Sequence, residues 1–390
     1  MLRFLEPIAM GWWNASQLLR VPLDLLRAGI LSGMNREYPH LVGAGRTEEA
    51  RQVLETGLAY TLAIIAVSQL VLGGMLLAAG RENPMLVWGL VTTTLVWALG
   101  VYAHYVRSML RTSRQFMLVG RVGVIVAILD AALVVLVWRF GFAGLAARAM
   151  ISATATFVLF YRQRDAATRP RMDWAVLRRL FAFGRHHYLT GFGLLLGAQA
   201  ERLMLLSVSG GVEWLGLYTP ALAAATLLQV VPGSMQGFHY PKIMEEFGRN
   251  GDERLLLKAT MTLIRRTFFA MILVSAAMAM GFVLLVELFL PRYVGGLPAA
   301  LITCAAGPFL AARVGVTYFS ALRRWPEYYF YTGLQCGLPF GLIWLALRWL
   351  PPLPAVALGG GLAIAVSGVA LVALVVMHGR KRSCLPPSPS

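Results

Sequence analysis

Long apolar segments, separated by short polar or glycine- and proline-rich breaks, make up almost the whole chain. Apolar runs of about 18 or more residues have the length that a bilayer core requires. Breaks such as 80–84 and 351–354 carry the glycine, proline and charged residues that separate helices. The pattern predicts eleven helices, at 8–34, 53–79, 85–106, 115–137, 142–161, 180–208, 213–237, 264–290, 296–320, 327–347 and 353–377. We therefore expect an all-α polytopic membrane protein with about 11 transmembrane helices.

Composition agrees with this class. Of 390 residues, 58% are hydrophobic and 14% are charged, with a mean hydropathy of +0.66, whereas soluble domains carry roughly 25% charged residues. The net charge of +17 raises the question of nucleic acid, but the basic residues gather in alternate short loops. No nucleic-acid partner is therefore expected. Three scattered cysteines give no metal or disulfide spacing, and we expect neither a metal nor a cofactor.

The basic residues predict the orientation of the chain. One set of loops and the tail carry 23 Arg and Lys, and the alternate loops carry four. Cytoplasmic loops hold the excess of positive charge. The predicted location is the inner (cytoplasmic) membrane, with a cytoplasmic C-terminus and cytoplasmic loops 35–52, 107–114, 162–179 and 242–266.

A loop motif at 32–45 has a degenerate copy later in the chain. Ser32, Tyr38 and Pro39 match Ser234, Tyr240 and Pro241 at a constant offset of 202. The chain therefore reads as two pseudo-repeated lobes of five and six helices. The predicted division is an N-terminal lobe at 1–165, a basic linker at 166–179, a C-terminal lobe at 180–378 and a disordered tail at 379–390. Helix 180–208 has no partner in the first half, so the first helix of a twelve-helix pattern is expected to be missing.

The motif itself is interpreted as architectural. The residue before proline avoids the α region, so Tyr38-Pro39 is expected to end a helix. Gly43 and Gly45 would allow a tight turn before the next helix. The structural motif residues are Asn35, Arg36, Glu37, Tyr38, Pro39, Gly43 and Gly45, with Tyr240 and Pro241 in the copy.

The order of the motifs resembles the polysaccharide-exporter (O-antigen type flippase) family of the multidrug/oligosaccharidyl-lipid/polysaccharide (MOP) superfamily. The resemblance rests on 29–30, 32–39, Gly43 and Gly45, and in the second half on 200–203, 216–218, 231–232, 240–241 and 290–293. It implies two helical lobes around a central cavity. It also implies a flippase that moves a polyprenyl-diphosphate-linked oligosaccharide for polysaccharide biosynthesis by alternating access, with polymerase or chain-length proteins as candidate partners.

Charged residues inside the apolar helices are the candidate site residues, since one Arg at the bilayer centre costs about 2.5–3.5 kcal/mol. Arg20, Asp24 and Arg27 share one helix face. Arg pairs with phosphate in a forked, bidentate way. The substrate-binding hypothesis names Arg20, Arg27, Arg148 and Arg202. The alternatives are an internally paired cluster in which Asp24 bridges two Arg, and an interfacial place for Glu201-Arg202.

Three carboxylates, Asp24, Asp130 and Glu201, are candidates for ion coupling or for charge pairs. Two further functions remain open: a membrane enzyme of polysaccharide assembly (polymerase or ligase), and a drug or metabolite antiporter of the same superfamily. The predicted outer loops are only a few residues long and offer little room for catalysis. An enzyme is therefore not expected.

Overall fold

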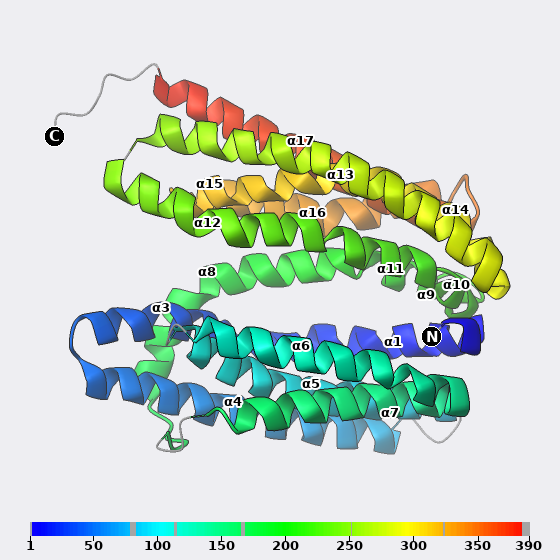
Figure 1. Ribbon diagram of the computed structural model, residues 1–390, viewed down its shortest axis with the longest axis horizontal. Coiled ribbons are helices and arrows are strands. Elements are labelled where there is room, and N and C mark those ends of the chain that lie inside the picture. Colours follow the sequence, from blue (N-terminus) through cyan, green and yellow to red (C-terminus); the bar gives the residue numbers. More distant parts are fainter. Residues whose placement is uncertain are drawn as a thin grey trace. The chain divides into compact units, whose positions relative to one another are not determined.

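The computed structural model describes residues 2–78, 83–112, 115–164, 168–250, 252–322 and 324–383. Within these ranges every regular element is a helix (Figure 1), which confirms the all-α class. The chain divides into two compact units, Met1–Phe192 and Gly193–Ser390. The boundary lies inside helix α8, Trp174–Ala198, beyond the predicted linker 166–179, and the lobe assignment of 1–165 and 180–378 stays a prediction.

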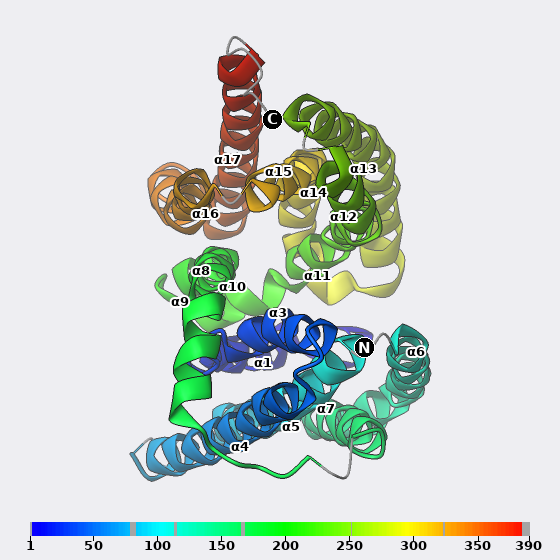
Figure 2. The ribbon, with the colours of Figure 1, turned by 90° about the vertical axis from the view of Figure 1, so that its left-hand side faces the viewer.

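The first unit begins with a helix that is broken into pieces and continues with long helices. Its elements are η1 Leu2–Phe4, α1 Pro7–Ser16, η2 Gln17–Leu19, α2 Arg20–Leu25, α3 Ile30–Gly43, α4 Thr47–Ala78, α5 Pro84–Thr112, α6 Phe116–Ala132, α7 Val134–Tyr161 and the first part of α8. α5 is central, since α1, α3, α4 and α7 all pack against it (Figure 2).

The second unit repeats this order after the end of α8. Its elements are α9 Ala200–Leu206, α10 Gly211–Leu217, α11 Thr219–Leu228, α12 Val230–Asn250, α13 Glu253–Phe289, η3 Pro291–Gly296, α14 Leu297–Ala306, η4 Gly307–Gly315, α15 Val316–Ala321, α16 Trp325–Ala346 and α17 Pro352–Ser383. A broken helix (α10–α12) again precedes a long one (α13). The two motif copies lie in the last pieces of the broken helices, α3 and α12.

The helices have the length and apolarity of membrane spans. Six helical segments of the described chain are long enough and apolar enough to cross a membrane. A seventh is added if the bent pair Gly211–Leu217 and Thr219–Gln236 forms one span. Among the remaining predicted ranges, 8–34 and 180–208 correspond to interrupted helices, whereas 327–347 corresponds to the single helix α16. This is a multi-pass membrane architecture whose element order follows the eleven predicted ranges.

The prediction of one continuous helix at 8–34 is wrong. Its helical pieces end at Leu25, and a turn separates them from Ile30. Ala28 and Gly29 both have positive φ, +45° and +73°. Glycine adopts this left-handed backbone freely, but alanine does so at a cost of roughly 1–2 kcal/mol. An apolar periodicity does not register such a break, because the residues on either side remain apolar.

The prediction that Tyr38-Pro39 ends a helix is also wrong. α3 continues through Pro39 to Gly43. A proline inside a helix removes one backbone hydrogen bond, and here packing outweighs that loss. Met34 and Leu41, on either side of Pro39, are almost fully buried in the core of the unit. The predicted turn follows instead at Gly43–Gly45, where Gly45 has a φ of +74°.

A tight hairpin separates the predicted helices 115–137 and 142–161. Gly141, inside α7, has φ +56° and ψ −126°, a backbone conformation that favours glycine. Gly144 then passes so close that an added Cβ would lie 2.0 Å from the carbonyl oxygen of Leu136. The kink at Gly141 thus lies where the sequence predicts the break.

Candidate functional site

The predicted charge cluster of the first helix lies at the end of α2 and in the turn that follows. Arg27 Nε lies 3.0 Å from Asp24 Oδ1, and the indole Nε1 of Trp97 in α5 donates to the same oxygen at 2.9 Å. The Arg27 guanidinium carbon is 5.8 Å from the Trp97 ring centroid. Asp24 is therefore held by an ion pair with Arg27 in the same broken helix and by a neutral hydrogen-bond donor from α5.

Arg20 does not share this pairing. Its side chain is exposed, and among the residues that the structure describes it has no ion pair with Asp24. The alternative in which Asp24 bridges both arginines is thus found for Arg27 alone. One cationic side chain of the predicted trio remains open to a ligand.

The facing surface of α5 adds polar residues that the sequence analysis missed. His104 lies within electrostatic reach of Arg27, Arg107 and Arg111. The hydroxyl of Ser108 is hydrogen-bonded to the side-chain oxygen of Asn35 in α3. Trp97, His104, Ser108 and Arg111 recur at helical spacing along α5, which was the available signal. We call Arg20, Asp24, Arg27, Trp97 and His104 the first-unit polar cluster.

Two tyrosines donate hydrogen bonds to the backbone at the helix break next to this cluster. Tyr60 of α4 donates its hydroxyl to the carbonyl oxygen of Leu26 at 2.6 Å. Tyr188 of α8 donates to the carbonyl oxygen of Leu25 at 2.7 Å. A break in a helix leaves carbonyl oxygens without their amide partners, and buried polar groups need replacements. Tyr60 supplies this replacement for Leu26, whereas the carbonyl oxygen of Leu25 also accepts from the amide of Ala28 at 3.3 Å, so Tyr188 is a second donor there.

Glycines bring α8 against the start of α3. An added Cβ on Gly33 would lie 2.2 Å from the carbonyl oxygen of Leu180, and Gly29 meets Gly184 in the same way. Small residues permit such backbone-to-backbone approach between membrane helices. The broken helix and α8 are thus locked in register, and Tyr188 is positioned over the break.

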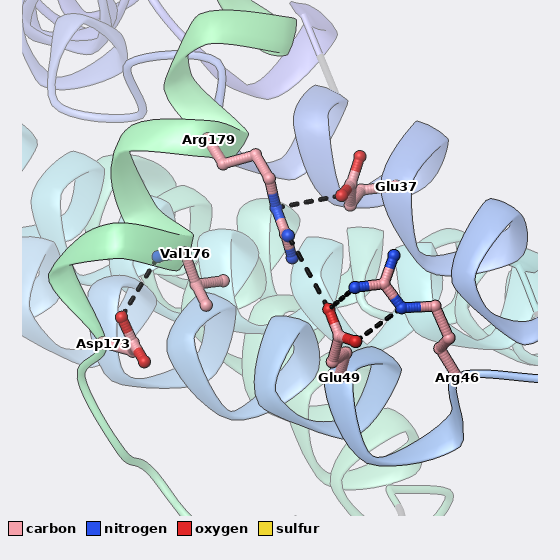
Figure 3. Close-up of polar contacts among 6 residues, drawn as sticks. All are labelled: Glu37, Arg46, Glu49, Asp173, Val176 and Arg179. Carbon is pink, nitrogen blue, oxygen red and sulfur yellow. Dashed lines mark hydrogen bonds and ion pairs between the residues drawn. The ribbon is translucent and has the colours of Figure 1, made fainter.

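Charged residues of the loop motif form an ion-pair network with α4 and α8 (Figure 3). Arg179 of α8 lies 2.9 Å from Glu37 and 3.9 Å from Glu49, while Arg46 pairs with Glu49 at 2.5 and 2.6 Å. Asp173 caps α8 by accepting from the amides of Ala175 and Val176. The network joins α3, α4 and α8, so Glu37 has a structural partner. The side chains of Tyr240 and Pro241, in the second copy, lie outside the described residues.

Arg148 and Asp130, which the sequence analysis named separately, are bonded to each other. Arg148 donates to the side chain of Asp130 and, through Nε, to the backbone carbonyl oxygen of Asp130 at 3.1 Å. This pair joins α6 to α7 across the hairpin. The ion pair gives each of the two charged side chains an oppositely charged partner within the first unit.

Glu201 and Arg202 belong to the second unit and have different surroundings. Arg202 donates to the side-chain oxygen of Gln199. Glu201 lies beside the hydroxyl of Tyr218 and so close to Gly360 that an added Cβ would lie 2.3 Å from its Oε1. The Glu201 carboxylate, Gln229 and Thr303 line a cavity of about 30 Å³. A cavity of this size can hold a single water molecule or a small ion.

The four predicted substrate arginines are distributed over both units. Arg20 and Arg27 lie together on the broken helix, Arg148 is committed to Asp130, and Arg202 lies in the other unit. In the described part of the chain, no group of three or more His, Cys, Asp or Glu side chains could hold a metal.

Comparisons with known proteins identify solved structures with a similar fold, but no sequence family that matches the chain. No protein-family model matches the chain, and a search of curated proteins finds no match. The structure is similar to an inward-facing multidrug resistance MATE family transporter of the MOP superfamily, with a TM-score of 0.80, 14% identity and coverage of 97% of this chain and 95% of that one. It is also similar to an outward-facing transporter of that kind, with a TM-score of 0.60, 15% identity and coverage of 96% and 93%.

A third similar structure is a MOP superfamily transporter from Pyrococcus furiosus, described by the reverse polarity of its binding pocket. Its TM-score is 0.65, at 15% identity, with coverage of 97% of this chain and 92% of that one. Identities this low show a shared fold alone. The chain therefore has a MATE-like fold of two lobes, and its substrate must be argued from its own residues.

Proposed function

We propose that this chain is a flippase that moves a polyprenyl-diphosphate-linked oligosaccharide across the cytoplasmic membrane by alternating access. The proposal is supported by the likeness of its fold to inward- and outward-facing transporters. The observation that carries it is the excess of positive charge in the first-unit polar cluster. Arg20 is exposed, Arg27 is half-buried, and Asp24 is the one carboxylate that pairs with them in the described chain.

A diphosphate head group fits this arrangement in charge and in geometry. It brings about two negative charges and many acceptor oxygens, which match forked Arg donors. Asp24 and Trp97 orient the Arg27 guanidinium and leave part of its donor edge for a ligand. Arg20, about one helical turn before Asp24, supplies a second cation. Arg148 and Arg202 stay predictions as substrate contacts, and their observed bonds to Asp130 and Gln199 favour structural roles.

The coupling group of the proposed cycle is Glu201. Its carboxylate faces a cavity of one-water size together with Gln229 and Thr303, which is a suitable place for a proton or a small cation. Asp130 is neutralised by Arg148, and Asp24 is held by Arg27 and Trp97. Both are therefore better suited to charge pairing than to ion exchange.

The test uses a deletion strain complemented with variants, in which lipid-linked oligosaccharides are extracted and assigned to a leaflet. Arg20→Ala and Arg27→Ala should trap completed precursors on the cytoplasmic face at unchanged protein level. Arg121→Ala is the matched control, because Arg121 is also an exposed helical arginine, on α6. Normal export in both cluster variants would contradict the proposed head-group site.

A drug or metabolite antiporter is the second candidate, and the likeness to a multidrug resistance transporter favours it. In that case deletion would leave surface polymer intact and would change the accumulation of small cations or metabolites. Precursors that reach the outer face but stay unpolymerised would instead identify an enzyme of polysaccharide assembly. The leaflet assay therefore separates all three functions.

A further inference from the structure

A groove on the second unit lies between the last piece of its broken helix and the long helix that follows. It has a volume of about 390 Å³, within the range of small-molecule sites. His239, Ile243 and Phe247 line it at four-residue spacing from α12, and Lys258, Thr262 and Arg266 do so from α13. Residues four apart share a helix face, so each helix presents one continuous stripe. We call this the α12–α13 groove.

The groove has an apolar floor and a basic rim. Ile243, Leu256 and Leu263 form the floor and are 8%, 2% and 5% exposed. Lys258 and Arg266 are exposed, and neither has an ion pair among the residues that the structure describes. Asp252, the acidic member of the lining, is engaged in capping α13, where it accepts from the amides of Arg254 and Leu255 at 2.7 and 3.4 Å. Among the described residues of the lining, Lys258 and Arg266 thus give the rim a positive charge that Asp252 does not pair with.

The sequence of α13 places this groove at the surface of the bilayer. Five of its first 14 residues are charged, whereas the 23 residues from Thr267 to Phe289 include one charge, Glu287. A helix of that length spans about 34 Å, close to the hydrocarbon thickness of about 30 Å. The hydrocarbon boundary thus lies near Arg265 and Arg266. The groove extends from this boundary toward the positively charged side of the membrane.

We infer that the α12–α13 groove binds an anionic phospholipid, with the phosphate between Lys258 and Arg266 and an acyl chain against the apolar floor. Basic pockets between membrane helices at the cytoplasmic surface favour such head groups. A soluble anion would gain nothing from the apolar floor, and a zwitterionic lipid would gain less from the two cations. The inference does not rest on the proposed transport function.

The test uses the full-length purified chain with phosphatidylglycerol and phosphatidylcholine, each titrated in native mass spectrometry. We expect a preference of about ten-fold or more for phosphatidylglycerol, since both rim cations attract its negative charge. The double variant Lys258→Gln/Arg266→Gln should reduce the affinity for phosphatidylglycerol to that for phosphatidylcholine. Thr262→Trp, which fills the groove and keeps both charges, should also abolish the preference.

Adjacent arginines provide the matched control. Arg266→Gln should lose most of the preference, whereas Arg265→Gln should keep it, because Arg265 does not line the groove. Size-exclusion profiles establish that each variant is folded. Equal affinity for the two lipids, or equal losses in the two single variants, would overturn the assignment. Displacement of phosphatidylglycerol by millimolar inorganic phosphate would also overturn it, because the site would then bind phosphate without the lipid chain.

Discussion

The carbonyl oxygen of Gly29 lies 2.0 Å from the position that a Cβ atom would take on Gly184. The turn of the broken helix and α8 therefore meet backbone to backbone. This contact also holds Tyr188, one turn further along α8, over the carbonyl oxygen of Leu25.

We predict that Gly184→Ala destabilises the first unit by about 1–3 kcal/mol, because the added methyl group meets backbone atoms that cannot move away alone. Gly191→Ala, on the same helix, is the control, since nothing lies within 4 Å of its added Cβ. Its effect should be neutral or slightly stabilising. Thermal unfolding in detergent measures both, and similar melting temperatures for the two variants would show that the close contact does not constrain the helices.

Loss of the Arg179 side chain should destabilise the junction of α3, α4 and α8. Glu37 is 8% exposed, and removal of its partner leaves a largely buried carboxylate, at a cost of about 1–3 kcal/mol. Arg178→Ala is the matched control, because Arg178 is exposed and has no ion pair in the described structure. Glu37→Gln should partly rescue Arg179→Ala. Failure of this rescue would show that Arg179 acts through contacts other than Glu37.

The Arg148–Asp130 pair should behave as one unit in a double-mutant cycle. Arg148→Gln and Asp130→Asn should each lower stability, and the double variant should lower it by less than the sum, by about 0.5–1 kcal/mol. The measurement is the unfolding midpoint of the four proteins in the same detergent. Additive effects would return Arg148 to the substrate-binding hypothesis, because its charge would then serve something other than Asp130.

Trp97→Phe should weaken the first-unit polar cluster. Trp97 is 4% exposed, and its indole donates to a carboxylate, a type of hydrogen bond worth about 1.5–3 kcal/mol. Trp88→Phe on the same helix is the control, since Trp88 is 63% exposed. The expected result is a lower melting temperature for Trp97→Phe alone, together with reduced export if Trp97 helps to orient Arg27. An equal effect of the two substitutions would contradict a role for the Trp97–Asp24 bond.

The sequence predicted the helical class, the order of the helices and the turn at Gly43–Gly45, because apolar run length and glycine placement are local signals. It predicted Arg20, Asp24 and Arg27 on one helix face, but α2 ends at Leu25 and Arg27 lies in the turn that follows. It could not predict the break at Ala28, since alanine there reads as an ordinary helix former and the left-handed backbone depends on contacts from α4 and α8.

Pairings between distant residues were also beyond the sequence pattern. The helical spacing of Trp97 and His104 shows that they share a face of α5, but it does not show that this face packs against the broken helix. Arg148 read as a free cation because Asp130, 18 residues earlier, is brought to it by the hairpin at Gly141. Pro39 read as a helix end because the tertiary packing of Met34 and Leu41 outweighs its local preference.

The break between Leu25 and Ile30 has an energetic consequence. A straight helix would return the carbonyl of Leu26 to a backbone amide and would relieve Ala28 of its left-handed conformation. In the broken form Tyr60 donates to Leu26 instead, and Tyr188 donates to Leu25 beside the amide of Ala28. The two forms would therefore differ by an exchange of hydrogen-bond donors and by the backbone strain at Ala28. Each tyrosine hydroxyl, worth about 1 kcal/mol, would change the equilibrium between the two forms about five-fold, and a ligand can shift that equilibrium by as much as its affinities for the two forms differ.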